Sequence, residues 1–195
     1  MPRLYILSGC NGAGKTTASY SLLPEMLECR EFVNSDEFAK SLSPFDPSAA
    51  SVSASRYMLI KTRYLLEREM DFSIETTLAT RSLVKIIEQA REKGYEIYLL
   101  YFWLSSPELA IQRVQARVQN GGHDIPDDTV RRRYKVGLQY LFNTYMPICD
   151  RWILADNSRP PFVVVAEGNR NGSQIKDFEK YATIRNIAYP KDRIR

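Results

Sequence analysis

The chain has 195 residues, 44% of them apolar and 26% charged, a balance typical of one globular domain that excludes a disordered or low-complexity polypeptide. No apolar run approaches the ~18 residues of a membrane helix, no signal peptide is recognisable, and the three widely spaced cysteines form neither a disulfide framework nor a zinc pattern. The net charge of +4 suits an anionic small molecule as well as a nucleic acid. We therefore expect a single cytoplasmic domain over residues 1–195 with no membrane partner.

The first half of the chain alternates short apolar runs with longer amphipathic segments. Strands are predicted at residues 4–7, 31–34 and 71–78, and helices at residues 15–27, 54–68 and 81–93. Pro24 ends or kinks the first helix, and a Ser/Pro-rich stretch over 41–55 predicts a loop. The helix over 54–68 is predicted because Tyr57, Ile60, Tyr64 and Leu65 recur at helical spacing.

The second half continues this alternation. The apolar and aromatic run over 95–104 predicts a central strand, with Trp103 in the core. Helices are predicted at residues 107–120 and 127–144 around a loop over 121–126, strands at 151–155 and 162–167, and a weak helix at 177–185 within a polar tail over about 169–195. This order predicts an α/β fold whose mostly parallel sheet of about five strands carries helices on both faces, with the ligand beyond the carboxyl ends of the strands.

The segment behind the first strand is GCNGAGKT, residues 9–16, and it fits the phosphate-loop pattern G-x-x-x-x-G-K-[ST] at every fixed position. Glycines let successive backbone N–H groups approach phosphate oxygens, and the N-terminus of the following helix adds positive potential. Lys15 supplies a cation for the outer phosphates, and the Thr16 hydroxyl is placed for Mg²⁺. The residues expected to bind ATP here are Gly9, Asn11, Gly12, Ala13, Gly14, Lys15, Thr16 and Thr17. The pattern predicts a three-layer P-loop NTPase or kinase fold.

A carboxylate follows the second predicted strand, in the segment FVNSDEF over 32–38. In a doubly wound sheet this strand end lies beside the phosphate loop. Asp36 could there accept the proton of an attacking hydroxyl or hold the metal ion. The alternative is an exposed acid that caps the next helix. We take Asp36 as the candidate base and as a substrate contact.

Polar residues also end the third strand, in SIETTL over 73–78. A carboxylate at a buried strand end usually has a partner. Glu75 could contact substrate hydroxyls or the water shell of magnesium, or it could form a structural salt bridge. Thr76 and Arg81 are further candidates for contacts with substrate at the same end of the sheet.

Two arginine-rich helices over about 107–145 have the features of a closing lid. Arg113 and Arg117 are four residues apart on one helix face, the loop between the helices contains Gly121 and Gly122, and three consecutive arginines begin at Arg131. An arginine fork spreads its charge over phosphoryl oxygens. Neighbouring residues on a helix diverge by ~100°, so one of the three must face solvent. We select Arg117, Arg132 and Arg133 as catalytic candidates, against the alternative of an ordinary solvated helix pair.

Two weaker signals complete the list. The segment LADNS over 154–158 follows the fifth strand, where Asn157 could hydrogen-bond the adenine of ATP or simply form a turn. His123, the only histidine, has no second metal-binding residue beside it and is interpreted as a residue of the lid loop.

Together, GCNGAGKT, FVNSDEFA, FSIETTL and RVQARVQNGGHDIP…VRRRY resemble the zeta-toxin-type P-loop kinases, especially short bacterial members, over most of the chain as far as ADNS. The resemblance implies ATP-dependent phosphorylation of a sugar-nucleotide hydroxyl, typically on UDP-N-acetylglucosamine. Asp36 would be the base, and Glu75 and Thr76 would contact substrate. The lid also resembles that of adenylate-kinase-type enzymes, which would place Arg113 on adenine and Arg117 on phosphate. The chain is shorter than the well-known toxins, and its NGGHDIP lid loop departs from theirs.

The function predicted from the sequence is therefore an ATP- and Mg²⁺-dependent kinase that acts on a small-molecule hydroxyl. A nucleotide or nucleoside kinase is the second hypothesis, supported by the lid. The third is a non-catalytic nucleotide-binding protein, such as a partner held by an antitoxin. Action on nucleic-acid ends is disfavoured, because it calls for a basic groove with exposed stacking aromatics, and the lid accounts for the basic residues.

Overall fold

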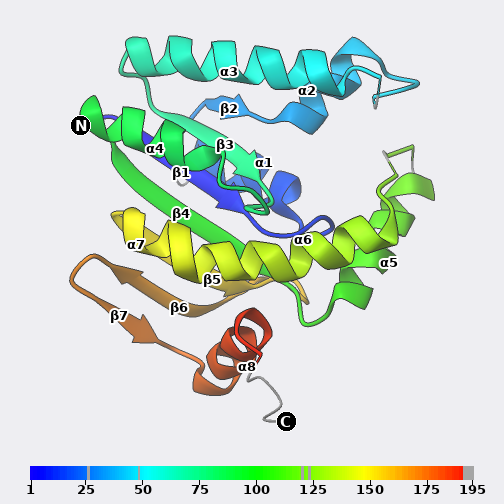
Figure 1. Ribbon diagram of the computed structural model, residues 1–195, viewed down its shortest axis with the longest axis vertical. Helices are drawn as coiled ribbons and strands as arrows, with labels where there is room; N and C mark the ends of the chain where they lie inside the picture. Colours follow the sequence, from blue (N-terminus) through cyan, green and yellow to red (C-terminus); the bar gives the residue numbers. More distant parts are fainter. Residues whose placement is uncertain (26, 48, 120, 123, 191–195) are drawn as a thin grey trace.

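The computed structural model describes residues 1–25, 27–47, 49–119, 121–122 and 124–190 as one layered α/β assembly (Figure 1). A seven-stranded sheet has the order β2-β3-β1-β4-β5-β6-β7. Its strands are β1 (Arg3–Ser8), β2 (Glu31–Val33), β3 (Phe72–Thr76), β4 (Glu96–Trp103), β5 (Arg151–Asp156), β6 (Val163–Asn169) and β7 (Gly172–Ile175). The helical elements are α1 (Lys15–Glu25), α2 (Ser35–Leu42), α3 (Ser51–Glu67), α4 (Leu83–Glu92), α5 (Pro107–Gln119), α6 (Asp127–Tyr140), a π-helical turn (Leu141–Tyr145), α7 (Met146–Ile148) and α8 (Phe178–Ala188).

The parallel part of the sheet confirms the predicted fold. β2, β3, β1, β4 and β5 pair in parallel, which gives the expected five strands. The total of seven differs from the prediction because β6 and β7 extend the sheet with antiparallel pairs. Only a short connection joins β5 to β6, too short for the helical crossover that a parallel pair needs. β7 lies in the predicted polar tail and is held by its hairpin with β6.

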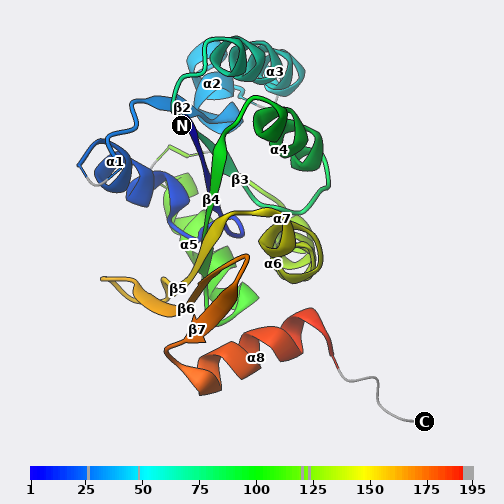
Figure 2. The same ribbon diagram turned by 90° about the vertical axis from the view of Figure 1, so that its left-hand side faces the viewer.

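Helices lie on both faces of the sheet. α1 lies on one face, whereas α4 and α6 lie on the other (Figure 2). β1 and β4 lie at the centre. The apolar side chains of β1 are almost fully buried, and so are those of β4 apart from Tyr98 and Leu100, which are partly buried, as expected for strands covered on both faces. Trp103 is 4% exposed, which confirms its predicted place in the core.

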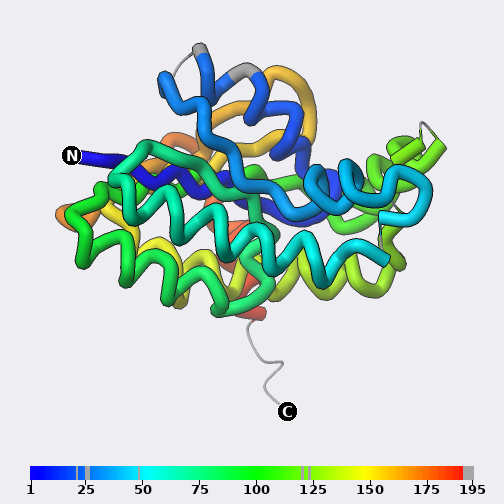
Figure 3. Tube along the Cα trace, turned by 90° about the horizontal axis from the view of Figure 1, so that it is seen from above, coloured from blue at the N-terminus to red at the C-terminus, as the bar shows by residue number. Residues whose placement is uncertain are grey.

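The segment after β2 differs from the prediction. α2 begins at Ser35, directly after β2, and the side chain of Asn34 caps it by accepting hydrogen bonds from the backbone N–H groups of Asp36 and Glu37. The predicted loop therefore contains the end of α2 and the start of α3. α3 lies with α2 at the outer edge of the sheet, nearest the viewer in Figure 3.

The periodicity that predicted α3 does not mark its packing face. Tyr57, Ile60 and Tyr64 are exposed, and only Leu65 of that set is buried. α3 instead packs through Ala54, Thr62, Leu65 and Leu66. The helix was correctly predicted from a spacing of apolar residues that lies mostly on its outer surface.

The second lid helix is fixed to the sheet near its middle. The indole Nε1–H of Trp103 donates to the hydroxyl of Tyr134 at 3.0 Å, and that hydroxyl donates to the carbonyl oxygen of Leu104 at 2.7 Å. Gly137 permits close packing, because a Cβ at this position would lie 2.7 Å from the carbonyl oxygen of Thr77. In the part of the chain that the structure describes, no helix is both long and apolar enough to cross a bilayer.

Candidate active site

The phosphate loop, residues 9–14, joins β1 to α1 in a conformation that requires glycine. Gly9, Gly12 and Gly14 have φ values of 141°, 75° and 80°. A Cβ on Gly12 would lie 2.5 Å from the carbonyl oxygen of Ala110, and one on Gly9 would lie 2.3 Å from that of Phe102. The loop is thus pressed between the sheet and the lid, with its backbone free of side chains where an anion would approach.

The largely buried carboxylate of Glu75 contacts the polar side chains at the start of α1. Glu75, at the end of β3, accepts a hydrogen bond from the Thr16 hydroxyl at 2.8 Å through Oε2, while its Oε1 lies 3.6 Å from Nζ of Lys15. Nζ of Lys15 also donates to the carbonyl oxygen of Cys10 at 3.0 Å. Burial raises the pKa of Glu75, and the Lys15 ammonium and the Thr16 hydroxyl partly oppose this. Glu75 therefore has the predicted partner, and that partner is the first turn of α1, directly after the phosphate loop.

Asp36 faces the same region from the first turn of α2. Its side chain is exposed, and it lines the cavity in front of the phosphate loop. Asn34 joins it to Glu75, because Nδ2 of Asn34 donates to Oε2 of Glu75 at 2.8 Å while Oδ1 accepts from the backbone N–H of Asp36 at 2.9 Å. One amide thus links the carboxylate of Glu75 to the backbone of Asp36.

The opposite wall of the site is the loop after β5. Nδ2 of Asn157 donates to the carbonyl oxygen of Ala13 at 2.7 Å. The guanidinium of Arg113 donates to the carbonyl oxygens of Asn157 and Ser158, each at 2.9 Å. Arg113, on the first lid helix, therefore holds the loop that in turn holds the phosphate loop.

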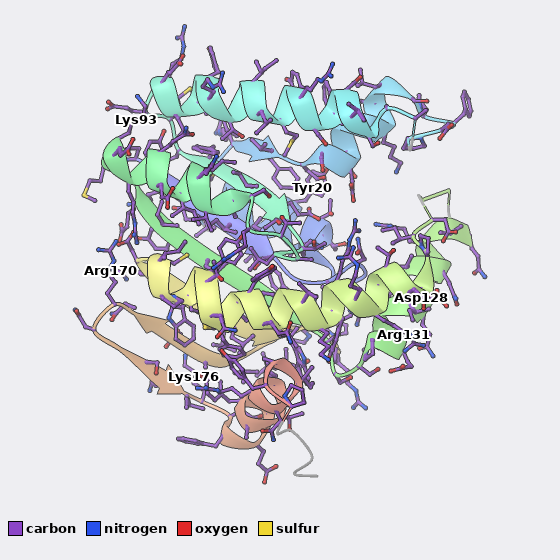
Figure 4. The ribbon with its side chains drawn as sticks, viewed as in Figure 1. Tyr20, Lys93, Asp128, Arg131, Arg170 and Lys176 are labelled. Atoms are coloured by element: carbon purple, nitrogen blue, oxygen red, sulfur yellow. The ribbon has the colours of Figure 1, made fainter. Side chains whose placement is uncertain are left out.

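The lid arginines differ in where they point. Arg133 is half-buried and donates through Nη1 to Oδ1 of Asn11 at 3.0 Å; burial lowers its pKa, and the nearby Asp36 acts in the opposite sense. Arg117 lines the cavity. Arg132 is exposed. Arg131 pairs with Glu108 of the first lid helix, near the outer end of α6 (Figure 4).

These elements enclose a cavity of about 550 Å³, here called the main cavity. Phosphate-loop residues, Asp36, Glu75, Arg113, Arg117 and Asn157 line it, and Pro160, Pro161 and Phe162 close one side. A smaller hollow of about 150 Å³, here called the side hollow, lies between α2, α3 and the lid. Asp36 and Arg117 line both spaces, so both side chains stand where the two meet.

Most of the residues predicted from the sequence meet at this site. Asn11, Gly12, Gly14, Lys15, Thr16, Thr17, Arg113 and Asn157 line the main cavity with Asp36, Glu75 and Arg117. Gly9 and Ala13 shape the loop from behind. Thr76 uses its hydroxyl oxygen to accept the backbone N–H of Leu78, and Arg81 is exposed; neither lines the main cavity. Arg132 and Arg133 do not line it either, and Arg133 reaches the site through Asn11. His123 lies outside the described residues.

Several residues of the site were not predicted from the sequence. Asn34 carries a recognisable signal, since Asn followed three residues later by Glu37 is the spacing of a helix-capping box. Pro160, Pro161 and Phe162 carry no comparable signal, because their place in the wall depends on how β6 returns beside β5.

A comparison with family models decides the family. The model for the zeta toxin matches residues 1–141, which include the phosphate loop, both carboxylates and the lid arginines. The chain belongs to the zeta toxin family. Among curated relatives, an uncharacterised protein of Haemophilus influenzae is 30% identical over 126 residues, which are 65% of this chain and 88% of that protein.

Solved structures with related folds include one from a toxin–antitoxin system. This zeta toxin family member superimposes over its whole length on a crystal structure of AvrRxo1-ORF1:AvrRxo1-ORF2 with sulphate ions, with a TM-score of 0.77 and 17% identity. It spans 66% of that matched chain. A structure from the PezAT chromosomal toxin-antitoxin system of Streptococcus pneumoniae matches 96% of this chain and 78% of its own, with a TM-score of 0.67 and 18% identity. At these identities the likeness is one of fold. Family and fold together support a kinase-like phosphotransferase.

Proposed function

We propose that the protein transfers the terminal phosphoryl group of ATP to a hydroxyl group of a small molecule. The observation that carries this proposal is the shared wall of the main cavity and the side hollow: Asp36 and Arg117 line both, and the phosphate loop lines the first. A phosphate donor in one space and a hydroxyl acceptor in the other would meet at these two side chains. Positioning and charge neutralisation supply most of the catalysis in such transfers.

The residues of the main cavity fit a triphosphate. The glycines keep the loop open to phosphate oxygens, and Nζ of Lys15 would reach them by leaving the Cys10 carbonyl and the Glu75 carboxylate. The hydroxyl of Thr16 donates a hydrogen bond to Glu75, so its lone pairs are free for a hard cation such as Mg²⁺. Among the described residues, no group of three His, Cys, Asp or Glu side chains could hold a metal ion. This suits a Mg²⁺ ion that is shared with the phosphates of the nucleotide, whose developing negative charge it would neutralise.

Asp36 is the proposed base. It is exposed at the junction of the two spaces and could accept the proton of the attacking hydroxyl as the new oxygen–phosphorus bond forms and the bond from the γ-phosphorus to the bridging oxygen breaks, which releases ADP. Arg117 and Arg133 approach from the lid, and their guanidinium groups would stabilise the charge on the phosphoryl oxygens. We keep Arg132 in a secondary role, since it would have to turn inward on lid closure.

A sugar nucleotide such as UDP-N-acetylglucosamine is the leading acceptor, on the strength of membership in the zeta toxin family. Other nucleotides, nucleosides and small metabolites are the alternatives. An antitoxin is a proposed partner, because the PezAT structure comes from a toxin-antitoxin system.

The test is an acceptor screen with γ-labelled ATP and Mg²⁺. The purified chain is incubated with UDP-N-acetylglucosamine, with nucleosides and nucleotides, and with a fractionated metabolite extract, and labelled products are identified by mass. Lys15→Ala serves as the inactive control. Labelled product that depends on Lys15 supports the proposal, whereas nucleotide binding without a labelled product in any fraction would contradict it.

A further inference from the structure

The side chain of Asn34 connects the candidate base to the phosphate loop. It is 8% exposed and stands at the junction of β2 and α2. Its Oδ1 accepts from the backbone N–H groups of Asp36 at 2.9 Å and Glu37 at 3.2 Å. Its Nδ2 donates at 2.8 Å to Oε2 of Glu75. These contacts place the amide between α2 and the end of β3.

The same carboxylate oxygen also accepts a hydrogen bond from the first turn of α1, which directly follows the phosphate loop. Oε2 of Glu75 accepts the hydroxyl of Thr16 as well as the amide of Asn34, both at 2.8 Å. Oε1 of Glu75 faces Nζ of Lys15. A continuous chain of contacts thus runs from the first turn of α1, through Glu75 and Asn34, to the backbone of Asp36.

The backbone alone holds this region weakly. β2 is an edge strand of three residues, and its last pair with β3 joins Val33 to Ile74. Asn34 and Glu75 each follow that pair by one residue, so their side-chain bond extends the contact beyond the end of the ladder. α2 otherwise packs mainly on α3, which lies outside the sheet. Without the bond, α2 would keep its fold but lose its fixed distance from the phosphate loop.

Only an amide can make both sets of contacts. Its oxygen faces two N–H donors, and its NH₂ group faces a carboxylate. In the reverse orientation the NH₂ group would face the two N–H donors and the oxygen would face the carboxylate, so neither set of hydrogen bonds could form. Aspartate caps a helix as well as asparagine does. However, it would place a second carboxylate against Glu75. The cap and the link to Glu75 can therefore be separated by one substitution.

We infer that Asn34 is a positioning residue that fixes Asp36 relative to the bound phosphates through its hydrogen bond to Glu75. The inference rests on the proposed phosphoryl transfer. Asn34 touches neither the nucleotide cradle nor the acceptor space directly, so its loss should affect turnover far more than nucleotide affinity. This distinguishes it from Lys15, whose loss should weaken nucleotide binding itself.

The experiment compares Asn34→Asp, Glu75→Gln and the double variant with the wild-type chain. Turnover is measured as phosphate release from MgATP with water as the acceptor, and nucleotide affinity by titration with a non-hydrolysable ATP analogue. Asn34→Asp should lower kcat roughly 10- to 100-fold, the range usual for residues that orient catalytic groups. It should leave the Kd of the analogue within about twofold. In the double variant the amide introduced at position 75 can donate to the carboxylate introduced at position 34. The bond is then restored in reverse and the two facing carboxylates of Asn34→Asp are gone, so kcat should exceed that of Asn34→Asp.

Two controls make the result specific. Asp177→Ala removes the side-chain cap of α8, which accepts the N–H of Lys180 far from the site, and should leave kcat unchanged. Thermal melts provide a readout apart from activity: the double variant should lose less stability than the sum of the two single losses, because it regains the bond.

Three results would overturn the inference: an Asn34→Asp variant with wild-type kcat, a parallel loss of kcat and nucleotide affinity, or additive melts. Nucleotide binding by the wild-type chain without any phosphate release or transfer would overturn the proposed function and the inference together. Wild-type transfer with an unaffected Asn34→Asp variant would overturn the inference alone.

Discussion

Asn157 and Ala13 are separated by 144 residues, yet Nδ2 of Asn157 donates a hydrogen bond to the carbonyl oxygen of Ala13 at 2.7 Å. This bond joins the loop after β5 to the phosphate loop. Arg113 fixes the same loop through two further bonds to backbone carbonyls. The lid helix α5, the wall of the main cavity and the phosphate loop therefore form one connected unit before any nucleotide binds.

The first prediction concerns that connection. Asn157→Ala leaves the carbonyl oxygen of Ala13 without its side-chain donor, which should lower the free energy of unfolding by about 1–3 kcal/mol. Nucleotide affinity should fall as well, because the wall of the cavity is no longer held. Denaturant unfolding, with and without an ATP analogue, measures both effects. Unchanged stability would show that this bond contributes nothing measurable.

The second prediction concerns the glycines. Gly12→Ala places a Cβ 2.5 Å from the carbonyl oxygen of Ala110 at a φ of 75°, so the variant should lose nucleotide binding and destabilise the packing of α5. Gly94→Ala is the matched control, since its φ is 76° and a Cβ there meets nothing within 4 Å. The control should cost only the backbone strain of about 1 kcal/mol and keep nucleotide affinity. Thermal melts and nucleotide titrations compare the pair, and equal losses would contradict the close packing of the phosphate loop.

The third prediction separates binding from transfer. Lys15→Ala should weaken binding of an ATP analogue at least about tenfold, because a cation that contacts the phosphates is removed. Asp36→Asn should retain that affinity and lose transfer, because an amide cannot accept the proton of the acceptor. Calorimetric titration and product formation are measured on both variants. Full activity of Asp36→Asn would mean that another group is the base.

The fourth prediction compares adjacent arginines. Arg133 contacts Asn11 of the phosphate loop, whereas Arg132 is exposed. Arg133→Ala should therefore reduce kcat by roughly 10²-fold or more, while Arg132→Ala should have a much smaller effect. Both variants remove one charge from the same helix turn, so a nonspecific electrostatic effect would appear equally in both. A larger loss in Arg132→Ala would indicate that the lid rotates on closure.

The fifth prediction concerns the dependence of stability on pH. Burial raises the pKa of Asp156. Hydrogen bonds from the hydroxyl and backbone N–H of Ser158 and from the Lys180 ammonium together lower the pKa by more than burial raises it, so the net pKa lies below its ordinary value. A depressed native pKa stabilises the fold above the unfolded-state value of about 3.9 and loses this contribution as the pH falls through the native pKa. Asp156→Asn should therefore lower Tm at neutral pH. The difference from the wild-type chain should shrink as the pH falls from neutral through the native pKa of Asp156, because the carboxyl group of the wild-type chain then loses its charge. A constant difference across that range would contradict the assignment.

Local patterns in the sequence were sufficient for the parallel core and for the centre of the site. The phosphate loop follows from its spacing, and Asp36 and Glu75 follow from their place at the ends of parallel strands, which share one edge of the sheet. The same rule could not assign Thr76, because its hydroxyl oxygen is used by the turn that ends at Leu78.

The remaining features depend on contacts between distant parts of the chain. β7 exists only as a partner of β6, and the exposure of Tyr57, Ile60 and Tyr64 depends on which face of α3 meets α2 and β2. Among consecutive arginines, the one that reaches Asn11 is selected by the phase of α6, which its contacts with the sheet determine. Periodicity alone does not give that phase.

The bond between Trp103 and Tyr134 has a consequence for motion. Because this part of α6 is attached to the end of β4, a movement of the lid would displace the N-terminal end of α6, while the part around Tyr134 would stay in place. Arg133 is the residue next to that anchor, so its guanidinium is held ready before the donor arrives. The fluorescence emission of the Trp103 indole would then stay constant while the outer end of the lid moves.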